Sequence, residues 1–149
     1  MPRISNSRFP NPPVQIKRVA RSVRKWAEAY QWVHGFPYTL AGLCCSASFL
    51  IFKEIKATKG LSPVLYWNDH HAFVFCEGFL VDVTATQFKR KQRVVIEPPP
   101  VKMPYYWEPL EGTRSLKFAT EVLGYFGHKP NEIISSYSRF LVDGNINPL

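Results

Sequence analysis

Cysteine is scarce in this chain, which has only three among its 149 residues. A disulfide framework in a small secreted domain needs several well-spaced cysteines. Cys44 and Cys45 are adjacent, so they do not form a pair that bridges two segments. The sequence therefore argues against a disulfide scaffold, and we expect the protein to be made in a reducing compartment.

Long apolar runs are also missing. No stretch approaches the roughly 18 apolar residues that a membrane-spanning helix needs. The basic N-terminus is followed by proline, asparagine and polar residues rather than by an apolar segment, so no secretory signal is visible. We expect a soluble protein without a membrane partner, located in the cytoplasm, with delivery to another cell left open.

Acidic residues are outnumbered, with 11 against 19 lysines and arginines, which gives a formal net charge of +8. Such an excess invites a nucleic-acid hypothesis. The basic residues are dispersed, however, apart from residues 17–25 and 89–93, and no zinc-finger spacing or other nucleic-acid motif accompanies them. We therefore expect an acidic protein or peptide partner ahead of nucleic acid, which the net charge alone does not exclude.

The proline distribution indicates how the chain is organised. The 13 prolines crowd residues 1–13 and 98–109, which predicts an extended N-terminal arm over 1–13 and an extended connection over 98–109. The aromatic residues Tyr105, Tyr106 and Trp107 in that connection are expected to pack on the surface. With 46% hydrophobic residues, the remaining chain can bury one core, so residues 14–149 are expected to form a single domain.

Hydrophobic periodicity predicts the elements of this domain. Apolar residues at helical spacing predict a helix over 14–33 and a second over 43–59 that ends at Gly60. Short runs of aromatic and β-branched residues then predict strands at 64–67, 71–76, 79–83 and 94–96. Two further helices are expected over 113–126 and 131–140, the last capped by Asn131. This order predicts an α+β fold with a small antiparallel sheet.

Cys44 is the candidate nucleophile, because it lies where a loop becomes the second helix. The positive end of a helix dipole favours a thiolate, and the unpaired N–H groups of the first turn can bind an oxyanion. Cys45 points about 100° away around the helix, so only one of the two thiols can face a site.

A histidine and an aspartate in the expected hairpin complete a catalytic constellation. If Glu77 and Gly78 form a two-residue turn, His71 and Asp82 become diagonal neighbours on one face of the sheet. A carboxylate that orients a histidine base is what a thiol nucleophile requires. A three-residue turn would reverse the parity and bring His70 to this face instead, so the spacing alone leaves the choice between the two histidines open.

Each of these residues also has an ordinary structural explanation. Cysteine is often a plain core residue, and histidine or aspartate near a strand end is often structural. A zinc site is a further alternative, with Cys44, Cys45, His70, His71 and Cys76 as possible ligands. The usual Cys-x-x-Cys spacing is absent, so we expect neither a metal nor another cofactor, and we expect Cys76 to pack at the hairpin end.

Three blocks of the sequence resemble the transglutaminase-like branch of the papain-like cysteine enzymes, especially small bacterial and phage-associated domains. The first is a Gly-x-Cys-x-x-Ala-Ser pattern at residues 42–48, the second is His71-Ala72-Phe73-Val74, and the third is an Asp-x-Thr-Ala-x-Gln-Phe pattern at residues 82–88. The resemblance covers about residues 38–90. It implies a papain/transglutaminase-like fold with Cys44 as nucleophile, His71 as general acid and base, and Asp82 as the orienting group.

The resemblance implies thiol acyl chemistry on an amide of a protein or peptide, of the protease, amidase, deamidase or transglutaminase type. The loop 34–42 and the aromatics Trp67, Tyr105, Tyr106 and Trp107 are candidate substrate walls. The alternative function is an inactive binding or inhibitor module whose basic face contacts an acidic protein or nucleic acid. Neither the substrate nor the acceptor can be derived from these motifs.

Overall fold

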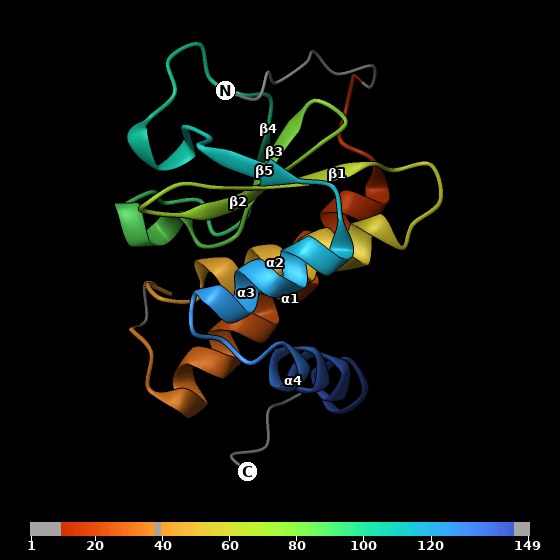
Figure 1. The fold of residues 1–149 in the computed structure, drawn as a ribbon, viewed down its shortest axis with the longest axis vertical. Coiled ribbons are helices and arrows are strands. Elements are labelled where there is room, and N and C mark those ends of the chain that lie inside the picture. The colour runs from red at the N-terminus through yellow and green to blue at the C-terminus, as the bar shows by residue number, and fades with distance from the viewer. Residues whose placement is uncertain (1–9, 38–39, 145–149) are drawn as a thin grey trace.

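The computed structural model describes residues 10–37 and 40–144, and within them the chain forms four α-helices and a five-stranded antiparallel sheet (Figure 1). The helices are α1 (Val14–His34), α2 (Cys44–Lys56), α3 (Leu116–Tyr125) and α4 (Pro130–Asp143). The strands are β1 (Pro63–Trp67), β2 (Ala72–Cys76), β3 (Phe79–Asp82), β4 (Val95–Glu97) and β5 (Glu111–Thr113). Two short 3₁₀ helices, η1 (Ala85–Phe88) and η2 (Tyr105–Trp107), follow β3 and precede β5. The predicted α+β class is confirmed. Most of the predicted arm lies outside the described residues.

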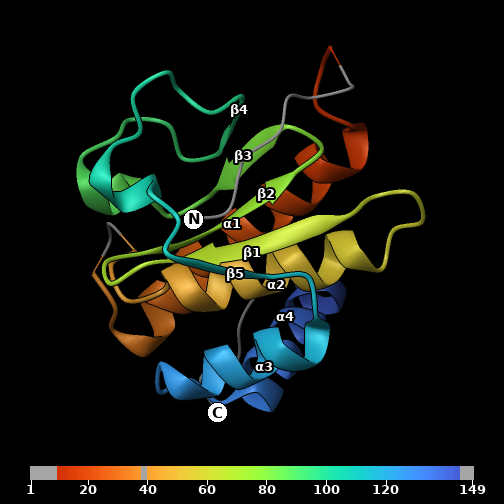
Figure 2. The same cartoon turned by 45° about the horizontal axis from the view of Figure 1, so that its top comes forward.

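The sheet has the order β4-β3-β2-β1-β5, and all of its neighbouring strands are antiparallel. Figure 2 shows α1 and α2 on one face of this sheet, with α3 and α4 beyond them. The segment that carries η2 covers part of the opposite face. Both faces of β2 are therefore buried, and its residues alternate between two apolar clusters: Val74 and Cys76 pack toward the helices, while Phe73 and Phe75 pack toward η2.

The helix predictions hold best where a buried stripe defines the element. The long first helix is confirmed, since Ile16, Ala20 and Val23 are fully buried, as its stripe predicted. The second helix ends at Lys56, earlier than Gly60, because Thr58 closes its last turn by bonding back to Glu54 and Ile55.

Two predictions about the C-terminal half are wrong at their boundaries. The third helix begins only at Leu116, since residues 111–113 pair with β1 as β5 and Ser115 caps the helix by accepting from Phe118 N at 3.2 Å. Lys129 rather than Asn131 precedes the last helix, because Pro130 occupies its first position, which suits a residue without an N–H.

The described part of the chain holds no helix that combines the length and the apolar character needed to cross a membrane.

Candidate active site

The N-terminus of α2 presents Cys44 at the end of the sheet where β2 begins. Leu43 is the N-cap and Cys44 the first helical residue, so the N–H groups of this turn have no acceptor within the helix. Cys44 is partly exposed and interacts with the His71 side chain. Cys45 points into the core, where it is only 6% exposed, and burial, with a smaller effect of Cys44, raises its thiol pKa to about 12. The expectation that only one of the two thiols faces the site is met in part: Cys44 is the more exposed thiol, but Cys45 also lines the hollow beside His71.

The hairpin between β2 and β3 has the predicted two-residue turn. Glu77 and Gly78 both have positive φ, at 53° and 88°, and Cys76 pairs directly with Phe79. A type I′ turn requires this backbone conformation at both positions, and it sets the register of the two strands. The register brings His71 to Asp82, with 2.6 Å between Nε2 and Oδ2, which resolves the choice between the two histidines. His70 is exposed and lies edge-on to Tyr105 instead.

Asp82 is a fully buried carboxylate, and its hydrogen bonds explain how a charge is accommodated between Val81 and Val83. Oδ2 accepts from His71 and from the indole Nε1 of Trp107 at 2.8 Å. Oδ1 accepts from the backbone N–H of Thr84 at 2.8 Å and from its hydroxyl at 3.3 Å. Burial alone would raise the pKa of this carboxyl, but His71 and the donors from Trp107 and Thr84 outweigh burial and lower the pKa. Asp82 is therefore held ionised.

The His71 imidazole is buried between Asp82 and Cys44. Burial on its own would lower the pKa of the ring, because it disfavours the charged form. The Asp82 carboxylate, its hydrogen bond and the contact with Cys44 act in the opposite sense, and together they raise the pKa to about 9. The ring therefore holds a proton more firmly than a free imidazole does, with one side on a carboxylate and the other toward a thiol that can supply the proton.

Gln87 contacts the ring nitrogen that Asp82 leaves free. Its amide Nε2 donates to the Thr84 carbonyl at 3.1 Å and lies 3.3 Å from His71 Nδ1. Because a carbonyl only accepts, the Gln87 bond to Thr84 shows that the NH₂ group, and not the amide oxygen, is the atom near Nδ1. An NH₂ group only donates, so the contact favours an Nδ1 that carries no proton. In the neutral ring the proton therefore lies on Nε2, facing Asp82, and Nδ1 is the nitrogen that can take up a second proton.

Two buried polar contacts fix the distance between helix and hairpin. The Ser48 hydroxyl, one helical turn after Cys44, donates to the carbonyl of Ala72 at 2.9 Å, and Ala72 is the residue that follows His71. Asn68 Oδ1 accepts from the backbone N–H of His71 at 2.9 Å, and its amide donates to the Glu108 carbonyl at 2.8 Å. These bonds tie α2, the start of β2 and the segment carrying η2 to one another.

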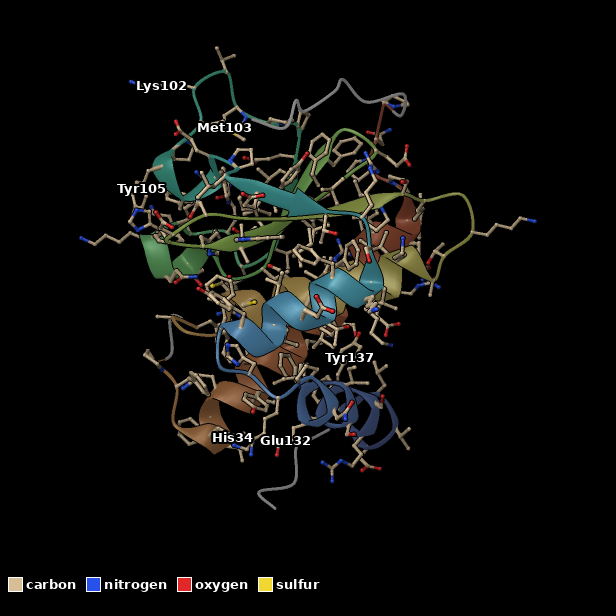
Figure 3. All side chains as sticks on the ribbon, in the orientation of Figure 1. His34, Lys102, Met103, Tyr105, Glu132 and Tyr137 are labelled. Carbon is tan, nitrogen blue, oxygen red and sulfur yellow. The ribbon has the colours of Figure 1, made fainter. Side chains whose placement is uncertain are left out.

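A hollow of about 150 Å³ opens over the thiol and the imidazole, with Asn68, Ala72 and Phe126 in its lining. Tyr105, 57% exposed, stands nearby at the edge of the molecule, edge-on to His70 (Figure 3). Phe126, at the end of α3, was not among the aromatics that the sequence proposed as walls. The described part of the loop 34–42 is not in the lining, and Tyr38 and Thr39 lie outside the described residues.

The expectation that Tyr106 and Trp107 pack on the surface is wrong. Trp107 is completely buried and Tyr106 nearly so, because both pack on Phe73 and Leu80 across the outer face of the sheet. The Trp107 indole instead donates a hydrogen bond to Asp82 on the side away from the hollow. Sequence analysis missed this role as well as those of Asn68 and Ser48. The only signal in the sequence was the presence of an apolar, aromatic-rich turn inside the proline-rich segment.

The zinc alternative gains no support from the residues that the structure describes. Among them, no group of three or more histidine, cysteine or acidic side chains is arranged to hold a metal ion. Cys76 is buried at the hairpin end, on the helical side of the sheet.

Comparison of the chain with protein-family models, with curated proteins and with solved structures found no match in any of the three.

Replacing Trp107 with phenylalanine should weaken the support that Asp82 gives to His71. The substitution keeps an aromatic ring but removes the indole donor to Asp82, which leaves that buried carboxylate one hydrogen bond short. We expect a loss of about 2 kcal/mol in the free energy of unfolding and a slowing of Cys44 alkylation of about tenfold, measured by denaturation and by mass spectrometry.

Trp26→Phe is the matched control for this variant. The Trp26 indole is also buried and donates at 3.0 Å, but to the Ser136 hydroxyl, far from the thiol. Its removal should cost stability without slowing alkylation. An equal slowing in both variants would show that Trp107 contributes only to general stability.

Proposed function

We propose that this protein is a thiol-dependent acyl-transfer enzyme of the transglutaminase-like, papain-like type, acting on an amide of a protein or peptide. The observation that carries the proposal is the buried His71–Asp82 pair, with 2.6 Å between Nε2 and Oδ2, in contact with the Cys44 thiol at the start of α2. A structural role alone gives no reason for a fully buried carboxylate to bind a histidine of raised pKa that faces a partly exposed thiol in a hollow. The α+β order and the three sequence blocks agree with this assignment.

The first half of the proposed reaction forms an acyl-enzyme. His71 Nδ1 takes the thiol proton, and the Cys44 sulfur forms a bond to the amide carbon. The carbonyl oxygen becomes an oxyanion, which the backbone N–H of Cys44 stabilises. His71 then gives its proton to the amide nitrogen, the carbon–nitrogen bond breaks, and an amine or ammonia leaves while Asp82 keeps the ring aligned.

The second half returns the enzyme to its starting state. Water or an amine gives a proton to His71 and attacks the thioester carbon. The carbon–sulfur bond breaks, and the proton returns to the Cys44 thiolate. Water yields hydrolysis or deamidation and an amine yields transfer, so the accessibility of the hollow to each decides the product.

Alkylation at pH 6 tests whether the thiol is activated, without knowledge of the substrate. We expect iodoacetamide to modify Cys44 more than tenfold faster than free cysteine, because His71 takes the thiol proton, whereas a free thiol is almost fully protonated at this pH. Peptide mass spectrometry locates the label, and Cys44→Ser should remove the fast phase. A rate at or below that of free cysteine would contradict the proposal and favour the inactive binding module.

Protein extracts treated with the wild type or with Cys44→Ala then distinguish the reaction subtypes. A gain of about one mass unit at glutamine indicates deamidation, loss of ammonia with crosslinking indicates transfer, and new termini indicate proteolysis, since each follows from a different fate of the acyl-enzyme. Identical modification by both proteins would exclude Cys44 as the source.

A further inference from the structure

The fold brings together two basic segments that lie far apart in the sequence, α1 and residues 89–93. Arg24 joins them from a buried position on α1. Its guanidinium donates to the Val83 carbonyl at 2.8 Å and to the Thr86 hydroxyl at 3.1 Å, and it pairs with Glu28 at 2.8 Å. The same guanidinium lies 3.5 Å from the Arg93 carbonyl, which links the loop after η1 to α1.

A cavity of about 540 Å³ lies at this junction. Its cationic lining consists of Arg24, Lys89, Arg90, Lys91 and Arg93, against one acidic residue, Glu28. Glu28 is already engaged by Arg24, and Arg90 stacks over Trp107 at 4.5 Å. The exposed side chains of Lys89, Lys91 and Arg93 therefore give the cavity a surplus of positive charge toward solvent.

A second group of basic residues lies along α1. Lys17, Arg21 and Lys25 follow one another at four-residue intervals, about 6 Å apart along the axis, and line a second cavity of about 420 Å³. Trp32 lies two turns beyond Lys25 on the same helix face and belongs to the lining of the first cavity. Its side chain is 83% exposed, which is unusual for a tryptophan.

We propose that this surface, formed by Lys17, Arg21, Lys25, Lys89, Lys91 and Arg93 together with Trp32, binds single-stranded nucleic acid. A row of cations that follows a phosphate backbone, next to an exposed aromatic ring on which a base stacks, is the arrangement by which proteins bind single strands without sequence preference. In a duplex the bases are stacked on one another and cannot reach Trp32. An acidic polypeptide would engage the cations but leave the exposed indole without a role.

The site is separate from the catalytic hollow. The 3₁₀ helix η1 lies between them, with Gln87 and Phe88 contacting His71 and Thr86 contacting Arg24. Binding is therefore independent of the proposed acyl chemistry, and Cys44→Ala should bind nucleic acid as the wild type does. Failure of one proposal leaves the other standing.

Fluorescence anisotropy with a fluorescein-labelled 12-nucleotide oligo-dT at 50 mM salt tests the proposal. The double variant Lys89→Glu/Lys91→Glu should weaken binding more than tenfold and flatten the salt dependence, because each lost phosphate contact reduces the log–log slope by about 0.7. Trp32→Ala should weaken binding about tenfold through lost base stacking, and Trp32→Phe should recover part of it.

The matched control is Lys59→Glu/Lys117→Glu, which makes the same change in net charge at two exposed lysines outside both cavities. It should change the affinity less than threefold. Equal weakening by both double variants, or no binding by the wild type, would overturn the proposal. Tighter binding of a 12-residue oligoglutamate than of oligo-dT would overturn it in favour of an acidic polypeptide.

Discussion

Replacing Cys44 with alanine should reduce turnover of the amide substrate by about four to six orders of magnitude, the range found when a catalytic nucleophile is removed. No described thiol can take its place. Cys45 borders the hollow, but it is only 6% exposed and its thiol pKa is raised to about 12. Cys76 is fully buried at the hairpin end. The variant should fold normally, because Cys44 is partly exposed and loses only its contact with His71.

Cys45→Ala is the matched control for this experiment, since it removes the adjacent thiol while leaving the site intact. It should retain at least a third of the wild-type rate and lose a small amount of stability from the core. Turnover of both variants is measured with the substrate identified in extracts. For Cys45→Ala, which keeps Cys44, the rate of Cys44 alkylation is a second measurement. A Cys44→Ala protein with more than 1% of the wild-type turnover would refute the assignment of the nucleophile.

Replacing Asp82 with asparagine should reduce turnover by about 10⁴-fold with little change in shape, as expected for the orienting group of a triad. An asparagine offers one acceptor oxygen in place of two, whereas His71, Trp107 and Thr84 all donate to this side chain. If its NH₂ group turns toward His71, the ring must hold its proton on Nδ1, and it can no longer accept the proton of Cys44. Turnover and the pH 6 alkylation rate should therefore fall together.

The same variant should change how stability depends on pH. The pKa of Asp82 is lowered by folding, so its stabilising contribution is present above the ordinary value near 3.8 and is lost as the pH falls through the folded value. The pKa of His71 is raised from 6.5 to about 9, so its contribution is complete below 6.5 and is lost as the pH rises through 9. A shift of this size corresponds to about 3 kcal/mol.

The wild-type free energy of unfolding should therefore be greatest between about pH 4 and 6.5, and Asp82→Asn should flatten both flanks of the profile. Denaturation at a series of pH values measures this effect. Asp69→Asn is the control, because Asp69 is an exposed carboxylate that lines the hollow over Cys44 and His71. A profile for Asp82→Asn that matches the wild type would show that His71 and Asp82 are not coupled.

The hairpin shows why part of the site could be derived from the sequence. A two-residue turn at Glu77 and Gly78 sets the register by local geometry, and the alternation of a strand then decides which side chains share a face. This reasoning reached His71 and Asp82 but left His70 as an alternative, because one more residue in the turn would have exchanged the two. In the structure Cys76 pairs directly with Phe79, so the turn is the shorter one.

Trp107 shows what local reasoning could not reach. Its segment has no periodicity that indicates a buried face, and its contact with Asp82 joins residues 25 apart across the outer face of the sheet. Asn68 is similar, since its bonds to Tyr105 and Glu108 depend on where the proline-rich connection returns to the sheet. Such contacts are decided by packing between segments.

Repeating patterns and turn chemistry act over a few residues, so the sequence alone predicted the four helices, the hairpin and the order of thiol, imidazole and carboxylate. It left the hairpin register open between two turn lengths. The bond from Trp107 to Asp82 and the meeting of Arg24 with the basic residues 89–93 at one cavity are seen only in the folded structure. Both depend on how segments distant in the sequence pack against the same sheet, since the contacts of Trp107 with Asp82 and of Arg24 with Arg93 join residues far apart along the chain.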